Sequence, residues 1–300
     1  MSYAIGIDIG GTKTAVGLYT LDCLPIDATS FPTEPQMGAD SLVKRISEAV
    51  RDIADKGGFE GKPSFVGVAC PGPLDLKEGR IVYIPTMGFK DIPIKKMLET
   101  ELGVTVALEN DANCAALAEA VSGAGKGFDN VVYITVSTGV GSGVVIGGKI
   151  YDGAASSAGE IGHLTVERDG IECACGKRGC LEKYASGTAI AEIATNRLGR
   201  AVDAKEVFAL CRKGDKICCE VVEQAAEHLA FALGAVWQLV DPDIVVLGGS
   251  VTKDFDVLEP LLSAALEKYV QPMSTRQIRL ALAHHSGEQG ILGAVYNAAT

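Results

Sequence analysis

The feature that most constrains the fold is a repeated unit of strand, glycine-rich tip and strand. The first copy, YAIGIDIGGTKTAVGLYT, begins at Tyr3 and predicts strands over 3–9 and 14–19 joined by a Gly-Gly-Thr-Lys tip. The second copy, NVVYITVSTGVGSGVVIGGKI, begins at Asn130, and its ITVSTGVGSGVV echoes IDIGGTKTAVGL. Glycine-rich tips can bind phosphate oxygens through backbone N–H groups, so one tip in each half suits two lobes gripping a nucleotide.

The rest of the chain alternates between strands and helices. Further strands are predicted over 64–69, 104–109, 244–247 and 278–283. Helices are predicted over 41–53, from 110 onward, and over 186–198, 205–213, 219–239 and about 288–299. This alternation, with hairpins among the strands, predicts an α/β fold with mixed sheets.

The length of 300 residues is enough for two lobes, each with its own core. The glycine-rich run GAGKG at 123–127 is typical of a hinge or lobe boundary. We expect a smaller N-terminal lobe of residues 1–117, completed by a C-terminal helix from about 288 to 300. Residues 118–287 would then form the larger lobe.

The formal net charge of −11 argues against nonspecific binding to nucleic acid or to an anionic membrane, since both need a basic surface. The N-terminus has no basic segment followed by an apolar one, and the apolar run at 229–240 is too short to span a bilayer. We therefore expect a cytoplasmic protein with reduced thiols. An odd count of nine cysteines also fits poorly with a disulfide framework.

The first tip, DIGGTKT, offers groups that suit a phosphate chain. Gly10 and Gly11 let the backbone approach a ligand closely, while Thr12 and Lys13 add a hydroxyl and a cation. Asp8 at the preceding strand end could hold Mg²⁺ through water. The motif is not a Walker loop, and a plain hairpin turn explains it equally well.

The segment ENDANCAA places Asp111 where a strand meets an Ala-rich helix. An aspartate there can be a simple N-cap. The functional alternative is a general base that accepts the proton of a hydroxyl as its oxygen attacks phosphorus. Asn110 beside it could hydrogen-bond to neighbouring hydroxyls.

The segments AGEIGHL and CACGKRGCLE together contain a complete set of zinc ligands. His163 precedes Cys173 by ten positions, and Cys175 and Cys180 follow. One imidazole and three thiolates fill a tetrahedral zinc site and leave no open position, so the metal would be structural. The spacing also differs from that of a nucleic-acid-binding zinc finger.

Taken together, DIGGTKT, ENDAN, STGVGSG, GEIGH and CACGKRGCLE resemble the ROK sugar kinases of the actin/hexokinase/Hsp70 superfamily, in order and approximate spacing from residue 4 to the C-terminus. The resemblance implies two ribonuclease H-like lobes, with ATP and the sugar in the cleft between them. It implies that Asp111 is the catalytic base acting on a hexose hydroxyl, usually O6 of an aldohexose. Sugar contacts would come from Gly72, Asn110, Glu160, His163 and Glu182.

The resemblance also implies the cofactors: ATP, Mg²⁺ and a structural Zn²⁺ held by His163, Cys173, Cys175 and Cys180. Nucleotide contacts would come from Asp8, Gly10, Gly11, Thr12, Lys13, Thr138, Gly139, Gly248 and Gly249. Relatives are commonly dimers or tetramers, which implies a homo-oligomer.

One segment departs from the family pattern. Glucose-phosphorylating relatives often carry Asn-Leu…Trp where this chain has IPTMGFKDIP, with Thr86, Met87 and Phe89. The sugar is therefore left open among glucose, its epimers and N-acetylhexosamines. ROK repressors share the same body but carry a winged helix ahead of the first hairpin. Here the first strand starts at residue 3, which favours a kinase over a sugar-sensing regulator or a non-catalytic sugar-binding protein.

Overall fold

The computed structural model describes residues 2–270, 278–285 and 287–300. Contacts divide the chain into two compact units. Unit 1 comprises Met1–Lys126, Gly143–Ala158 and His285–Thr300, and unit 2 comprises Gly127–Ser142 and Gly159–His284. No helix in the described part of the chain combines the length and the apolar character that a bilayer span needs.

Unit 1 is built on a mixed five-stranded sheet with the order β3-β2-β1-β4-β8. Its strands are β1 (Ala4–Ile9), β2 (Lys13–Tyr19), β3 (Pro25–Pro32), β4 (Phe65–Cys70) and β8 (Val106–Asn110). The first three strands pair antiparallel, whereas β1, β4 and β8 run parallel. The carboxyl ends of β1, β4 and β8 therefore lie at one edge of the sheet, where ligands bind in such folds.

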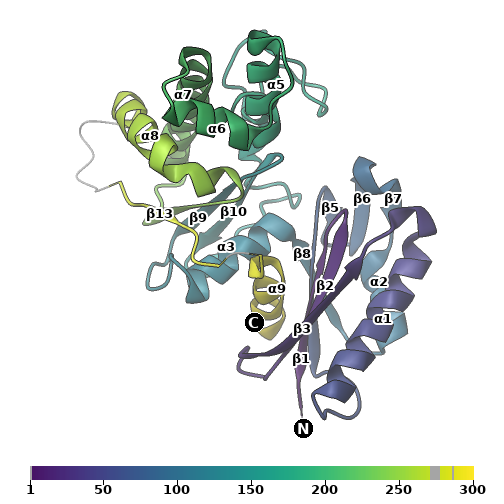
Figure 1. Cartoon of the computed structure of the whole chain (residues 1–300). Coiled ribbons are helices and arrows are strands. Elements are labelled where there is room, and N and C mark those ends of the chain that lie inside the picture. Colours follow the sequence, from purple (N-terminus) through teal and green to yellow (C-terminus); the bar gives the residue numbers. More distant parts are fainter. Residues whose placement is uncertain (1, 271–277, 286) are drawn as a thin grey trace. The chain divides into compact units, whose positions relative to one another are not determined.

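One face of this sheet is covered by α1 (Ala39–Lys56) and α2 (Ile94–Leu102), as Figure 1 shows. Alternate residues of β1 point to this face, because side chains alternate along a strand. Ile5, Ile7 and Ile9 accordingly pack with Ile46 and Leu98 into a fully buried core. A small antiparallel sheet borders this core, made of β5 (Leu74–Asp75), β6 (Arg80–Ile84) and β7 (Phe89–Ile92), with η2 (Pro85–Met87) between β6 and β7.

The other face carries α9 (Gln289–Ala299), which also packs against α3 (Asp111–Ser122). The approach is so close that a Cβ atom at Gly67 of β4 would collide with the Ala294 backbone. Only glycine fits there, so the small residues in the middle of the sheet let the helix pack closely against it. The same face carries Asp8 towards the start of α9.

Unit 2 contains three parallel strands and most of the helices. The second sheet has the order β11-β10-β9-β12-β13, and β12 pairs parallel with both β9 and β13. Its strands are β9 (Val131–Val136), β10 (Val140–Ile146), β11 (Lys149–Ile150), β12 (Ile244–Gly248) and β13 (Leu280–Leu282), and the division between the units falls inside β10.

The helices of unit 2 gather around the long helix α7 (Lys216–Leu239). Those that pack against it are α4 (Glu182–Ala185), α5 (Gly187–Leu198), α6 (Ala204–Arg212) and α8 (Phe255–Tyr269). Two short helical turns, η3 (Ile161–His163) and η4 (Val251–Asp254), belong to the same unit, and η1 (Pro35–Met37) belongs to unit 1.

The predicted α/β class with mixed sheets is confirmed, and each predicted helix and strand is found within a few residues of its expected bounds. The prediction omitted β3, β5–β7, β11, α2, α4 and α8. The units also differ from the expected lobes, because residues 118–126 and 143–158 group with unit 1. In that unit α3 runs unbroken to Ser122, and Gly143 lies against the Ala112 backbone.

Candidate functional site

The junction between β8 and α3 presents Asn110 and Asp111. Asn110 is the N-cap of α3, and its Oδ1 accepts the backbone N–H groups of Ala112 at 2.9 Å and Asn113 at 3.3 Å. Asp111 is the first residue of the helix, and its Oδ1 also accepts the Ala112 N–H, at 2.8 Å. The capping role therefore belongs mainly to Asn110, which leaves the half-buried Asp111 carboxylate at the positive end of the helix.

Asn110 has a further neighbour in Gly72. A Cβ atom on that glycine would lie 3.3 Å from Asn110 Nδ2. The structure thus brings together Gly72, Asn110 and Asp111, three of the residues that sequence reasoning assigned to the sugar.

Asp8 lies on β1, at the same edge of the sheet. Burial, and secondarily the negative charge of Asp111, raises the pKa of Asp8 to about 6, and Lys13 partly opposes this. A Cβ atom at Gly290 would lie 2.6 Å from Asp8 Oδ2, so glycine at that position makes room for the carboxyl group beside α9. Two carboxyl groups that repel each other at the end of a parallel sheet can bind one cation together. Alternatively, they can take different roles in one reaction.

The first glycine tip joins β1 to β2. The Gly10 N–H donates to the Lys13 carbonyl at 3.0 Å, which closes the turn. Gly10 therefore shapes the tip, while Gly11, Thr12 and Lys13 are its exposed residues. These three are the groups that this tip can offer to a phosphate chain.

Unit 2 has a hollow of about 600 Å³ beside the second glycine tip. Ser137 and Thr138 of the tip line it, together with Ser250 and the first turns of α5. The Ser137 carbonyl accepts the Gly187 N–H at 2.7 Å, which ties the tip to the start of α5. Helix N-termini favour anions, so this hollow is suited to a phosphorylated ligand.

Sequence reasoning missed the helical wall of this hollow, formed by Gly187, Thr188, Ala191, Glu192, Thr195 and Asn196. The available signal was Ser186-Gly187-Thr188, a helix start: Ser186 caps α5 by accepting the Ala189 N–H. Gly248, which was assigned to adenosine, is buried at the end of β12 against Tyr133, and Gly249 leads from it to Ser250 on the hollow's wall. Gly139 lies beside the Glu182 carboxylate.

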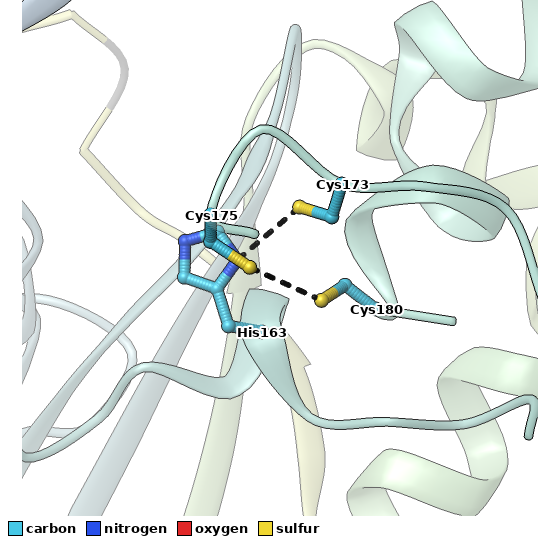
Figure 2. Close-up of side chains that lie close together, drawn as sticks. All are labelled: His163, Cys173, Cys175 and Cys180. Carbon is cyan, nitrogen blue, oxygen red and sulfur yellow. Dashed lines mark hydrogen bonds between the residues drawn. The ribbon is translucent and has the colours of Figure 1, made fainter. Parts of the chain in front are cut away.

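The imidazole of His163 and three thiols form what we call the metal cluster: His163, Cys173, Cys175 and Cys180 (Figure 2). Their ligand atoms all lie within 4.8 Å of one another. His163 Nδ1 is 3.7 Å from Cys173 Sγ, and Cys175 Sγ is 3.5 Å from Cys180 Sγ. His163 ends η3, and the thiols belong to the loop that precedes α4.

These separations fit zinc. Tetrahedral ligands at zinc's usual bond lengths lie about 3.8 Å apart for two sulfurs and about 3.6 Å apart for a sulfur and a nitrogen. Burial first, and then the neighbouring thiols Cys175 and Cys173, raise the pKa of Cys180. A divalent cation would offset this cost by stabilising the thiolates.

Two further carboxylates, Glu160 and Glu182, flank the metal cluster in sequence. Glu160 is exposed and immediately precedes η3. Glu182 begins α4, two residues after Cys180, and accepts the Val140 N–H at 3.0 Å. Glu182 thus links the metal-cluster loop to the second glycine tip, a contact that sequence reasoning did not foresee.

The segment that departs from the family pattern is mostly part of the core. Met87 and Phe89 are each 4% exposed and pack in unit 1. Thr86 is exposed, and a Cβ atom on Gly11 would lie 3.8 Å from its Oγ1. Of these three residues, Thr86 is the one that can meet a ligand.

The model of the ROK family matches residues 4–300. This chain is a member of the ROK family. It is 34% identical over 306 residues to a glucokinase of Halalkalibacterium halodurans, covering 96% of this chain and 92% of that protein. The family's sequence features and the fold described above therefore agree.

Two solved ROK structures resemble the whole chain. A ROK hexokinase of Thermus thermophilus is 36% identical with a TM-score of 0.87, covering 99% of this chain and 97% of that one. A ROK glucokinase of Streptomyces griseus in complex with glucose and AMPPNP is 29% identical with a TM-score of 0.81, covering 99% of both chains.

Proposed function

We propose that this protein is an ATP-dependent hexose kinase that phosphorylates O6 of an aldohexose or a related N-acetylhexosamine. The observation that carries the proposal is the position of Asp111 at the N-terminus of α3, opposite Asp8, in a ROK chain. The glucokinase of H. halodurans and the glucose and AMPPNP complex of the S. griseus enzyme support the substrate class.

Asp111 acts as the general base in this proposal. Its carboxylate accepts the proton of the sugar hydroxyl while the hydroxyl oxygen attacks the γ-phosphorus of ATP, and ADP leaves. The Ala112 N–H holds one carboxylate oxygen, which orients the other for the incoming proton. Asn110 and Gly72, which are neighbours, would orient the sugar beside it in this proposal.

The nucleotide is held by two glycine tips. In unit 1, Gly11, Thr12 and Lys13 are the groups assigned to phosphate binding. In unit 2, Thr138 and Gly139 have the same assignment, and Thr138 lines the hollow. The hollow beside α5 takes the adenosine, with Gly249 leading to its Ser250 wall. Bound Mg²⁺ would neutralise phosphate charge, with Asp8 holding it through water.

The metal cluster holds a structural zinc ion in this proposal. Its four protein ligands leave no position for a substrate, so the metal serves to fix the loop geometry. His163 binds the metal through Nδ1, which directs Nε2 elsewhere, and Glu182 follows the last ligand closely. We propose that these two side chains, with Glu160, contact the sugar hydroxyls.

The test is a coupled ADP-release assay across glucose, N-acetylglucosamine, N-acetylmannosamine and allose, with wild-type protein and Asp111→Asn. The wild type should turn over at least one sugar, and the variant should lose at least about a hundredfold in kcat while still binding that sugar. Asp129→Asn, an exposed aspartate away from the site, is the matched control. Near-normal kcat for Asp111→Asn would refute the base assignment, and no turnover on any sugar would refute the kinase.

A further inference from the structure

We infer that Glu109 is a positioning residue for the catalytic base: its buried carboxyl group shares one proton with Asp152 and so fixes the turn that presents Asn110 and Asp111. The inference rests on the proposed function, in which Asp111 is the base. The inference assigns a role to two residues, Glu109 and Asp152, for which no contact with the sugar or the nucleotide is proposed.

Glu109 lies immediately before Asn110, in register with Ala69 and Asp8 on the face of the sheet that carries α9. Neighbouring side chains of a strand alternate, so the last residues of β8 send Glu109 and Asn110 to opposite faces. Glu109 is 3% exposed. Its Oε1 accepts the Asn110 N–H at 2.7 Å and the Asn113 side-chain amide at 2.9 Å. One oxygen therefore ties together the residues on either side of Asp111.

Asp152 supplies the second carboxyl group beside Asn113, from a distant part of the sequence. It lies just after β11, and its Oδ1 accepts a hydrogen bond from Asn113 Nδ2 at 3.2 Å. Asn113 Nδ2 thus contacts both carboxyl groups, which sets the Glu109 and Asp152 side chains next to each other. A hydrogen bond between two carboxyl groups requires a proton on one of them, because two carboxylates can only accept.

The surroundings favour keeping this proton near neutral pH. Burial is the largest cause and raises the pKa of Glu109 to about 7, while the hydrogen bonds from Asn113 and Asn110 oppose this and the charge of Asp152 adds to it. Burial also raises the pKa of Asp152. Asp152 is the charged group that acts on Glu109, and the titratable groups nearby are acidic or thiol: Asp8 of β1, Cys70 of β4, and Asp111 and Cys114 of α3. Glu99 of α2 instead accepts the Val106 N–H at the start of β8, and α9 carries Tyr296.

The shared proton matters because the junction is held by a few bonds. Asn110 and Asp111 both depend on the Ala112 N–H, so a small rotation of the turn changes where the base points. When the proton leaves, two adjacent carboxylates repel each other and the Asn113 amide cannot hold both in place. We therefore expect the base to lose its alignment as Glu109 ionises.

The test compares the pH dependence of kcat for the wild type, Glu109→Gln and Glu109→Leu. Glutamine mimics the protonated acid: its oxygen accepts from Asn110, and its amide donates to Asp152. We expect wild-type kcat to fall about tenfold from neutral to alkaline pH, with sugar KM changed less than about twofold, and Glu109→Gln to remove that fall. Glu109→Leu should lower kcat about tenfold at every pH.

Two outcomes would overturn the inference. The same alkaline fall in wild type and Glu109→Gln excludes the shared proton, and an unchanged kcat in Glu109→Leu excludes positioning. Glu99→Gln is the matched control, since Glu99 also binds a backbone N–H of β8 but far from the junction. Its pH profile should follow that of the wild type. Asp152→Asn removes the proton acceptor from the other side and carries the test if a Glu109 variant does not fold.

A readout independent of activity separates this inference from the kinase proposal. The wild type at neutral pH should show the infrared band of a protonated carboxyl group, and Glu109→Gln and Asp152→Asn should both lack it. Its presence in both variants would overturn the shared proton even if the protein phosphorylated every sugar tested. If the wild type phosphorylates no sugar but shows the band, the kinase proposal fails and the proton pair stands.

The pH dependence of thermal stability gives a further test of the shared proton. The folded state holds a proton that an ordinary glutamate, with a pKa of 4.5, has lost by neutral pH. This stabilisation is fully present below the ordinary pKa and is lost as the pH rises through about 7. Glu109→Gln should therefore gain in melting temperature relative to the wild type as the pH rises from 5 to 8, and a constant difference would contradict the pair.

Discussion

Two groups of cysteines in unit 2 have the same number of thiols and different surroundings. The metal cluster sets three thiols and an imidazole on loops, with every ligand atom within 4.8 Å of the others. The second group, which we call the α6–α7 thiols, comprises Cys211, Cys218 and Cys219. There the Cys211 thiol lies 2.6 Å from Cys219 Sγ, and the Cys219 thiol turns to the Cys211 carbonyl at 3.2 Å.

The difference shows what a zinc site needs beyond thiols. Cys211 and Cys219 satisfy each other and the helix backbone. Burial raises the pKa of Cys211 as it raises that of Cys180, so the pKa does not separate the two groups. The metal cluster has a fourth donor in His163 and a separation of ligand atoms that a tetrahedral ion fills. A count of cysteines cannot distinguish the two groups, but the fourth donor can.

The largest expected effect comes from removing one ligand. Cys173→Ser should lower the zinc content from about one equivalent per chain to near zero, because serine supplies no thiolate. Sugar KM should rise by at least about tenfold, since the loop that carries Glu182 and orients His163 is no longer fixed. Metal analysis and sugar kinetics check this. A folded, active wild-type protein that contains no zinc would remove the distinction between the two thiol groups.

Alkylation of native protein should sharpen the comparison. Cys175 is exposed, so accessibility alone predicts fast reaction with iodoacetamide. A zinc-bound thiolate is a poor nucleophile, and we expect its labelling to rise at least about tenfold after chelation. The α6–α7 thiols should react at the same rate with and without the chelator. Mass spectrometry of the labelled peptides gives each rate, and fast labelling of Cys175 before chelation would contradict a filled site.

The smallest effect is expected at Cys219. Cys219→Ser should leave the zinc content and kcat within about twofold of the wild type, because the thiol makes local hydrogen bonds only. It should lower the melting temperature by about 2–4 °C, as expected for a loss near 1 kcal/mol. A loss of zinc in this variant would show that the two groups are coupled.

The parts of the site that could be predicted are those whose residues lie close together in sequence. GEIGH and CACGKRGC contain all four members of the metal cluster, and ENDAN contains both the cap and the first residue of α3. The Glu109–Asp152 pair could not be predicted, because the two residues are far apart in sequence and only the fold around β11 brings them together. The hollow beside α5 could not be predicted for the same reason, since its walls come from four separate segments.

The missed elements have local causes. Residues of β3 are mostly exposed, and PIDATSFP lacks the alternation of a half-buried strand. Pro260 lies inside α8, where proline normally argues against a helix, and packing against α7 overrides that preference. Met87 and Phe89 stand in the segment that departs from the family pattern, and they are buried in unit 1 because β7 and η2 turn them into the core.

The position of α9 has a consequence for the order in which the protein can mature during translation. The sheet of unit 1 presents a strip of small residues, including Gly67, that this helix covers. A nascent chain that has emerged from the ribosome as far as β13 still lacks α9. The helices α4–α8 of unit 2 can therefore pack together before α9 is made, while the strands of unit 1 still lack this helix. The edge of the sheet that carries Asp8 and Asp111 is covered only after α9 has been made.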